Sequence, residues 1–503
     1  MRTRMQFILA LGLLTLTTTA AVAQTPTHPD QIEFPPLTFD PPQAADYRHT
    51  ISSSAGEVPV YLAPSHEFPL ISVTFTFNGG SDQDSSDAAG LASAMASMMR
   101  RGGTATVSAE DMDEEFDFLA AIASANAAGT RTTATLSALA SNFDESFALF
   151  VDMLRNPGFD AERLDLYRQE QLEGMKQRDD HPASILAREW RFLMYGDDSF
   201  MSAMSTARSN AALTNSALGA MHGRIVHPGN LIISASGDFD AQAMLARIEH
   251  ALAGWAAGPE IADPQAPTHE LVRGLYAYEK DIPQGRVNIG HRSIRRDDPD
   301  YFPMMLMNRI LGGGGFTSRI VSRVRSDEGL AYSAGSRLLP NVYFPGEFRA
   351  SFQSKNRTVA LATKLIFEEF ERIRTTPVSA AELETNQNAL IERFPQRFES
   401  KAGMLRTFVN DERTNRDPDY WNRYRDNVRA ITAEDIMRVA AKHLHPDKMA
   451  ILVVGVWDEI RVGDLEGRAT MDEFFGGNVT SLPRRDPMTL KSLKSVKTLK
   501  TPK

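Results

Sequence analysis

The chain has 503 residues, more than one hydrophobic core usually organises, and a formal net charge of −10. Its 42% hydrophobic and 23% charged residues are the proportions of a soluble globular protein. The acidic balance disfavours nucleic acid as a partner. The absence of cysteine excludes disulfides, thiolate nucleophiles, Cys-based metal sites and a lipid-modified N-terminal cysteine.

Residues 1–23 are typical of a cleaved secretory signal peptide. Arg2 and Arg4 precede an apolar stretch that is too short to span a membrane, and Ala-Val-Ala at 21–23 is a small-residue cleavage site. We therefore expect cleavage after residue 23 and export to the periplasm, with release from the cell as the alternative. No later segment has the roughly 18 uninterrupted apolar residues of a transmembrane helix. The proline-rich residues 24–44 predict an extended lead-in.

The next part of the chain predicts a mixed α+β unit. Pro69 leads into an alternating strand over 72–77, a polar loop and a helix from about Gly90. A charged helical stretch follows at 161–178. A His-Pro pair at 227–228 then ends a helix, because proline cannot continue it, and precedes an apolar strand that ends in glycine.

The same plan returns about 215 residues further on. Pro283 leads into a strand over 287–290, a polar loop and a helix to Leu311. A weaker match is the charged helical stretch around 381–398. A second His-Pro pair, at 445–446, again separates a helix from an apolar strand that ends in glycine. The chain is therefore expected to contain two similar units.

These patterns predict the domain organisation. Each unit should hold an antiparallel-rich sheet with helices on one face. The Pro-, Ala- and Gly-rich stretch between the units is typical of a linker. The C-terminal segment has lysine at every third position near its end, which does not form one helical face, so we expect a disordered basic tail, with contact to an anionic partner or a membrane surface as the alternative. The predicted boundaries are 45–255 for the first unit, 256–270 for the linker, 271–478 for the second unit and 479–503 for the tail.

One stretch of the second unit resembles a known family. Residues 283–333 contain LGGGGFTSR at 311–319, followed by Arg325 and by GLAYS at 329–333. This stretch is similar to the C-terminal unit of the M16 metallopeptidases, the pitrilysin, insulinase-like and mitochondrial processing peptidase family. The resemblance covers about residues 40–475. It implies two homologous units that form half of a clamshell around a peptide.

The resemblance also shows a gap in the first unit. Active members carry His-x-x-Glu-His on the helix after Gly-Leu-Ala, so that two histidines on one helical face bind zinc and the glutamate acts as general base. Here those positions are Ser93, Ala96 and Ser97. The family's third ligand, a later glutamate, is best matched by Glu173 and next by Glu170. The resemblance therefore implies no metal bound by this chain and no hydrolysis by this chain alone.

Other candidate motifs have structural interpretations. His443 and His445 are the closest histidine pair, but they lie at the repeated helix stop. The glycines at 312–315 lack the Gly-Lys-Ser/Thr ending of a phosphate loop and favour a turn that another backbone approaches closely. The methionines in the predicted helices are expected to fill the core; they are Met95, Met98, Met99, Met304, Met305 and Met307.

Two hypotheses of function follow from the resemblance. In the first, the chain is the non-catalytic subunit of a heterodimeric M16 peptidase whose partner carries His-x-x-Glu-His and zinc. Arg325 and Tyr332, seven residues apart, would then act on a peptide held at the partner's site. Substrate would also contact the turn formed by Gly313, Gly314, Gly315 and Phe316. In the second, the chain is an inert scaffold or peptide-binding protein, like the core subunits of respiratory complexes. Arg325 then makes only a surface ion pair with Asp327 or Glu328, and Tyr332 is an ordinary strand residue.

Overall fold

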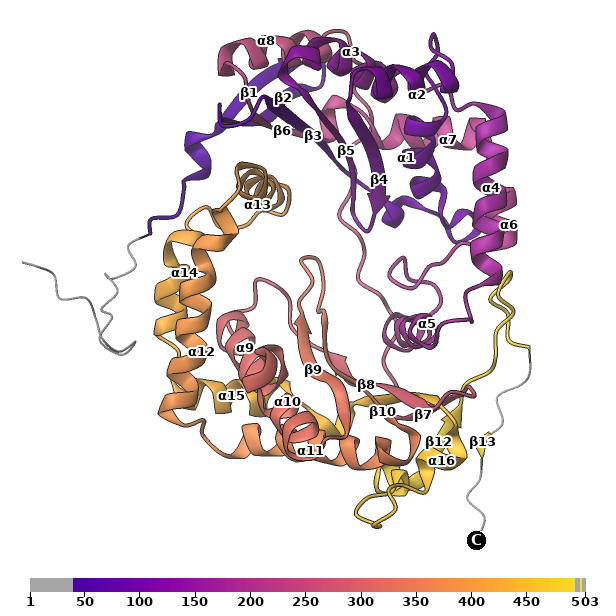
Figure 1. Ribbon diagram of the computed structural model, residues 1–503, viewed down its shortest axis with the longest axis vertical. Helices are drawn as coiled ribbons and strands as arrows, with labels where there is room; N and C mark the ends of the chain where they lie inside the picture. Colours follow the sequence, from indigo (N-terminus) through magenta and orange to yellow (C-terminus); the bar gives the residue numbers. More distant parts are fainter. Residues whose placement is uncertain (1–38, 494–497, 500–503) are drawn as a thin grey trace, which may run out of the picture. The chain divides into compact units, whose positions relative to one another are not determined.

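The computed structural model describes residues 39–493 and 498–499 (Figure 1). The expected signal peptide and almost all of the proline-rich lead-in lie outside the described residues. Within the unit formed by residues 41–503, the strands form one six-stranded and one seven-stranded sheet.

The first half of this unit holds the six-stranded sheet, in the order β1-β2-β6-β3-β5-β4. All neighbouring pairs are antiparallel except β2 and β6, which are parallel. The strands are β1 (Arg48–Ser53), β2 (Gly56–Pro64), β3 (Leu70–Asn78), β4 (Ile122–Ala128), β5 (Arg131–Leu139) and β6 (Leu231–Gly237). The helices are α1 (Leu91–Arg101), α2 (Ala109–Phe118), α3 (Phe143–Arg155), α4 (Ala161–Lys176), α5 (Pro182–Tyr195), α6 (Ala207–Ala211), α7 (Asn215–Ile225) and α8 (Ala241–Leu252).

The second half repeats this topology. Its sheet has the order β13-β12-β7-β11-β8-β10-β9, so β7, β11, β8, β10 and β9 correspond to β2, β6, β3, β5 and β4. The strands are β7 (Gly274–Glu279), β8 (Gln284–Arg292), β9 (Ala331–Leu339), β10 (Glu347–Lys355), β11 (Ala450–Gly455), β12 (Val479–Ser481) and β13 (Thr498–Leu499). The helices are α9 (Tyr301–Asn308), α10 (Arg319–Val321), α11 (Val359–Thr375), α12 (Ala380–Arg393), α13 (Lys401–Arg413), α14 (Tyr420–Arg429), α15 (Ala433–His443) and α16 (Trp457–Arg461). The predicted pair of homologous α+β units is confirmed.

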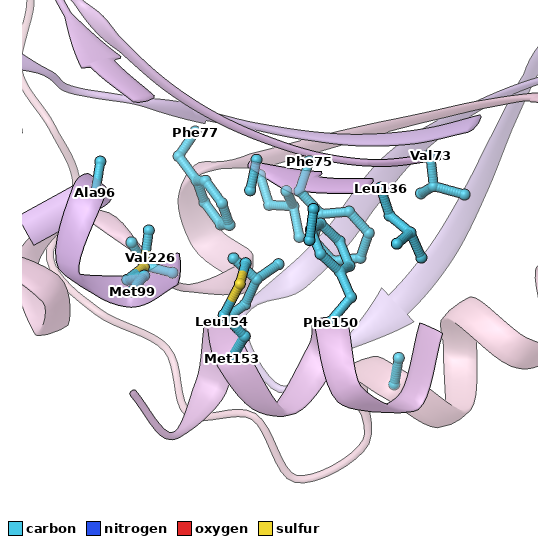
Figure 2. Packing of buried hydrophobic residues seen from close by; sticks show 14 of the residues in the cluster. Val73, Phe75, Phe77, Ala96, Met99, Leu136, Phe150, Met153, Leu154 and Val226 are labelled. Atoms are coloured by element: carbon cyan, nitrogen blue, oxygen red, sulfur yellow. The ribbon is translucent and has the colours of Figure 1, made fainter. Parts of the chain in front are cut away.

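Each unit has its own hydrophobic core. In the first, alternate residues of β3 are buried, because successive side chains of a strand point to opposite faces of the sheet. Phe75 and Phe77 thereby meet α3, where Phe150 and Met153 are fully buried (Figure 2). All the methionines predicted to fill the core are fully buried except Met305, which is partly exposed.

The second face of each sheet is covered by a helix from the other half, an arrangement that was not predicted from the sequence. Helix α5 packs on β8 and β11, and α13 packs on β2 and β6. Polar contacts fix both helices. The buried indole of Trp190 on α5 donates to Glu347 at 3.0 Å, and Glu412 on α13 accepts hydrogen bonds from Arg48 and Tyr61. Each half therefore supplies one helix to the outer face of the other half's sheet.

The prediction of a disordered tail from residue 479 is wrong for 479–493 and 498–499. Val479 pairs in parallel with Leu275 of β7, and β13 pairs with β12. The backbone N–H of Leu482 donates to Ala277, and Arg485 contacts Glu189 at 3.2 Å. The segment is held by backbone pairing with a sheet edge and by a buried carboxylate, so its polar composition is no guide to its order. Residues 494–497 and 500–503 lie outside the described part of the chain.

The expected linker, 256–270, contains no helix or strand. None of the helices in the described part of the chain is long and apolar enough to cross a membrane.

Candidate functional site

Helix α1 carries the positions of the expected zinc motif. It begins after Gly90, whose φ of 98° lies in the left-handed region that favours glycine. The carboxylate of Asp84 accepts hydrogen bonds from the backbone N–H groups of Gly90 and Ala92, each at 2.8 Å. Burial raises the pKa of Asp84, and these two hydrogen bonds oppose that shift. Asp84 therefore accepts hydrogen bonds from backbone N–H groups at the N-terminus of α1.

The three motif positions offer no metal ligand of the family type. The hydroxyl of Ser93 donates to the backbone carbonyl of Ala127 on β4 at 2.9 Å. Ala96 is fully buried among the core residues, and Ser97 is partly exposed. Hydroxyl and methyl groups at these positions cannot replace two imidazoles and a carboxylate base.

A cavity of about 270 Å³ lies beside Ser93. Helix α4 contributes Tyr167 and Gln171 to its wall, and Asn210 contributes a buried side chain whose Oδ1 has no hydrogen-bond partner. Among the lining residues, Asp84 alone is charged. Apart from the Asp84 carboxylate, which is hydrogen-bonded to the start of α1, the polar side-chain groups are amides and hydroxyls, which do not fit zinc.

The two candidate glutamates on α4 make other contacts. Glu170 accepts two hydrogen bonds from Arg101, both at 2.8 Å, and the hydrogen bonding from Arg101 lowers the pKa of Glu170. Glu173 is 65% exposed and pairs with Lys176 at 2.6 Å. Neither lines the cavity beside Ser93.

Among the described residues, one group of three side chains has metal-ligand spacing: Asp298, Asp300 and His443. The carboxylate of Asp300 accepts hydrogen bonds from Arg438 at 2.8 Å, Lys442 at 2.7 Å and His443 at 2.7 Å. Arg438 and Lys442 thus already compensate the charge of this carboxylate. The group is an ion-pair network that joins α15 to the start of α9.

His445 also has a structural role. Its backbone N–H donates to Nε2 of His291 at 3.1 Å, and the two imidazole rings lie 5.8 Å apart. His291 in turn donates from Nδ1 to the carbonyl of Arg292. In this arrangement His443 contacts Asp300 and His445 contacts His291.

The second candidate site lies at the glycine-rich turn after α9. A Cβ on Gly312 would lie 2.5 Å from the backbone nitrogen of Ser336 on β9, so the turn packs directly against that strand. Gly315 has a φ of 78° and open space around it. The turn then enters α10, where Arg319 donates to both carboxylate oxygens of Glu382 at 2.8 and 2.7 Å. This ion pair fixes the turn to α12.

Three residues of this region form an exposed stack. The guanidinium carbon of Arg325 lies 4.4 Å from the ring centroid of Phe316 and 4.9 Å from that of Tyr332. Phe316 is 68% exposed and Tyr332 is 86% exposed. Glu328, one of the two acids expected as an ion-pair partner of Arg325, instead pairs with Arg468 at 2.7 Å. The structure thus brings together the predicted Arg/Tyr pair and the aromatic residue of the turn.

Several contacts that define these sites were not predicted from the sequence. The three changed positions on α1 were predicted, but the cavity wall formed by Tyr167 and Gln171 and the pairing of Arg101 with Glu170 were not. The four-residue spacing of Tyr167 and Gln171 places them on one face of α4, but the sequence does not indicate that this face meets α1.

Comparisons with known proteins agree with this geometry. Residues 61–197 match the family model described as insulinase (peptidase family M16), and residues 212–390 match that of the peptidase M16 inactive domain. The chain therefore belongs to the M16 family. The chain has the M16 fold without the family's catalytic residues in its first unit.

The similar proteins include one named as a non-peptidase and one named as a protease. The chain is 24% identical over 375 residues to the non-peptidase homolog YmxG of Helicobacter pylori, covering 73% of this chain and 84% of that protein. It is 28% identical over 194 residues to an uncharacterized zinc protease of Mycobacterium leprae, and this match covers 38% of this chain and only 43% of that relative's length.

Solved structures share the fold over most of the chain. A peptidase M16 inactive domain from Pseudomonas fluorescens has a TM-score of 0.72 and 26% identity, covering 81% of this chain and 97% of that chain. A chain of complex III2 from Candida albicans has a TM-score of 0.64 and 14% identity, covering 82% and 96%, and thus shares the fold alone.

Proposed function

We propose that this chain is the non-catalytic, substrate-binding subunit of a secreted heterodimeric M16 peptidase. The observation that carries the proposal is the exposed stack of Phe316, Arg325 and Tyr332. No carboxylate within ion-pair distance of Arg325 is found among the described residues, so its donors are available to a peptide carbonyl. The partner is a chain with His-x-x-Glu-His, at which the peptide is hydrolysed.

The chemistry of the stack suits that role. A tyrosine hydroxyl donates one directed hydrogen bond, which stabilises the oxyanion of a tetrahedral intermediate. An arginine keeps its charge and directs its planar donors toward a carbonyl. The face of Phe316 holds the guanidinium in place, because a cation is attracted to an aromatic ring. Gly315 has open space around it and lets the substrate backbone approach this group closely, whereas Gly313 and Gly314 pack against Asn308 and Arg309.

The test is co-expression with an M16 chain that carries His-x-x-Glu-His, followed by peptide cleavage by the purified pair. We expect a stable complex that buries more than about 2,000 Å². Tyr332→Phe should leave assembly intact and lower kcat by roughly 10²–10³, the usual loss for one oxyanion donor. Arg325→Ala should weaken both binding and turnover. Tyr47→Phe, at a partly exposed tyrosine of the first unit, is the matched control.

The alternative function is an inert scaffold, favoured by the likeness in fold to a respiratory-complex chain. Full peptidase activity of a complex that contains the double variant Arg325→Ala/Tyr332→Phe would support the scaffold function. It would contradict a chemical contribution by this chain. A chain that stays monomeric beside every M16 partner would contradict the heterodimer.

Export is part of the proposal. It is supported by the Arg2 and Arg4 cluster, the apolar stretch and the small-residue site at 21–23. N-terminal sequencing of the mature protein from a periplasmic fraction should begin at Gln24. A mature chain that begins at Met1 in the cytoplasmic fraction would contradict export.

A further inference from the structure

We propose that a groove along helices α13 and α14 binds an acidic peptide segment. Two adjoining cavities, of about 330 and 480 Å³, form the groove. They share the side chains of Arg397, Arg406, Thr407 and Tyr424. The groove is separate from both the Ser93 cavity and the stack at Arg325.

Arginine dominates the wall of this groove. Its five arginines are Arg131, Arg393, Arg397, Arg406 and Arg416. One carboxylate, Asp411, lines it as well. The chain as a whole carries a net charge of −10, so the excess of cations here is local.

The single acid is already engaged. Asp411 contacts Arg416 at 2.8 Å and accepts a hydrogen bond from the indole of Trp421 at 2.6 Å. It therefore neutralises Arg416 and leaves the other arginines uncompensated. In the described part of the chain, Arg131, Arg393 and Arg406 have no carboxylate within ion-pair distance.

The uncompensated cations lie close enough to repel one another. Burial, and then the like charges of Arg413 and Arg406, lower the pKa of Arg131. Such repulsion costs free energy, which a bound anion relieves. The planar fork of arginine donors matches a carboxylate in a bidentate arrangement. The groove is thus suited to carboxylates in particular.

Aromatic faces complete the site. Arg397 lies 4.6 Å from the ring centroid of Trp421, and Arg416 lies 4.1 Å from that of Tyr420. These rings hold the guanidinium groups at fixed positions and offer apolar surface to the methylene groups of aspartate or glutamate side chains.

The surroundings of the groove favour a short acidic segment over a long polyanion. Asp417, Asp419 and Asp426 are exposed on or beside α14, where the first two contact Arg423 and the third contacts Arg429. These residues offer no uncompensated cation to a longer polyanion, whereas a few acidic side chains fit within the two cavities. The inference rests on the proposed function only in taking the anion to be a peptide.

Binding to the purified chain alone tests the proposal, so its failure is distinct from a failure of the heterodimer. Isothermal titration calorimetry compares acetyl-tetraglutamate amide with acetyl-tetraglutamine amide, at low and at physiological salt. We expect binding of the glutamate peptide that weakens as salt rises, and at least tenfold weaker binding of the glutamine peptide. Equal binding of the two peptides would overturn the proposal.

Variants locate the site. Arg406→Gln should weaken binding of tetraglutamate at least tenfold, and Arg397→Gln/Arg406→Gln should abolish it. Both side chains are exposed, and matching thermal unfolding midpoints would show that the variants fold. Arg208→Gln on α6, at an arginine that is 81% exposed, is the control and should bind as the unchanged protein does. Undiminished binding by the double variant would refute the groove.

Two further probes separate the sources of negative charge. Inorganic pyrophosphate and a single-stranded oligonucleotide are titrated under the same conditions. We expect both to bind at least tenfold more weakly than the tetraglutamate peptide. Tighter binding of either one would overturn the assignment to an acidic peptide.

Discussion

Glu189→Gln tests the contact that fixes the C-terminal segment to the rest of the protein. Glu189 on α5 is 1% exposed, and it accepts hydrogen bonds from Arg188 at 2.8 Å and from Arg485 at 3.2 Å. Arg188 is 2% exposed and also contacts Asp179 at 2.5 Å. Two cations and two carboxylates therefore balance in the buried group.

The substitution keeps the shape of the side chain and removes one negative charge. The group is then left with an uncompensated buried cation, and breaking a buried ion pair in this way costs about 3–5 kcal/mol. The glutamine carbonyl still accepts a hydrogen bond, and Arg485 keeps some contact with solvent. We therefore expect a loss at the lower end, about 3 kcal/mol of unfolding free energy. Glu173→Gln, at an exposed i,i+3 pair, should cost at most about 0.5 kcal/mol.

Urea unfolding at pH 7 measures both variants, with tryptophan fluorescence as the signal. Trp190, next to Glu189 and fully buried, reports on the same helix. Limited proteolysis should also cut the segment after Ser481 faster in Glu189→Gln. In Glu189→Gln/Arg485→Gln the charge balance returns, so the double variant should lose less than the sum of the single variants. A cost no larger than that of Glu173→Gln would refute the reasoning.

Three further predictions concern single contacts. Burial lowers the pKa of His291 to about 4, so on acidification the unfolded chain binds a proton before the folded chain does. The free energy of unfolding should therefore fall by roughly 3 kcal/mol as the pH drops from about 6.5 to 4. His291→Gln should remove that part of the pH dependence, as measured by urea unfolding. Burial alone would raise the pKa of Asp300, but the hydrogen bonds from its cationic neighbours lower it. Asp300→Asn should therefore lower the free energy of unfolding by about 1–2 kcal/mol at pH 7. The difference in stability between this variant and the unchanged protein should vanish in acid, where the carboxylate of the unchanged protein becomes protonated. Ser93→Ala leaves the carbonyl of Ala127 without its hydroxyl donor and should cost about 1 kcal/mol in thermal or urea unfolding; an unchanged stability would show that water replaces the donor.

The repeat was predictable from the sequence because its signals are local. Proline after histidine ends α7 and α15 for steric reasons, and the following apolar runs enter β6 and β11. Alternation over 72–77 lies within β3, and the helix expected from Gly90 is α1. Such patterns depend on the period of the backbone, which the sequence carries directly.

The partners of these elements were not predictable in the same way. The apolar face of α5 shows that it is buried, but not that it covers the sheet of the other half. The order of residues 479–493 depends on Ala277 and Glu189, which lie hundreds of positions away. The arginine-lined groove likewise combines a residue of β5 with residues of α12 to α14, so no local motif marks it.

The two halves differ in what their candidate polar groups contact. On α1, the hydroxyl of Ser93 is satisfied by a strand carbonyl, and Glu170 is held by Arg101. In the second half, Arg325 lies between two exposed rings and meets no carboxylate among the described residues. Polar groups that are hydrogen-bonded within the protein stabilise the fold and have few donors or acceptors free to bind a substrate. A charged group held in position with free donors can act on one. The proposed contribution of this chain to peptide hydrolysis therefore lies in its second unit.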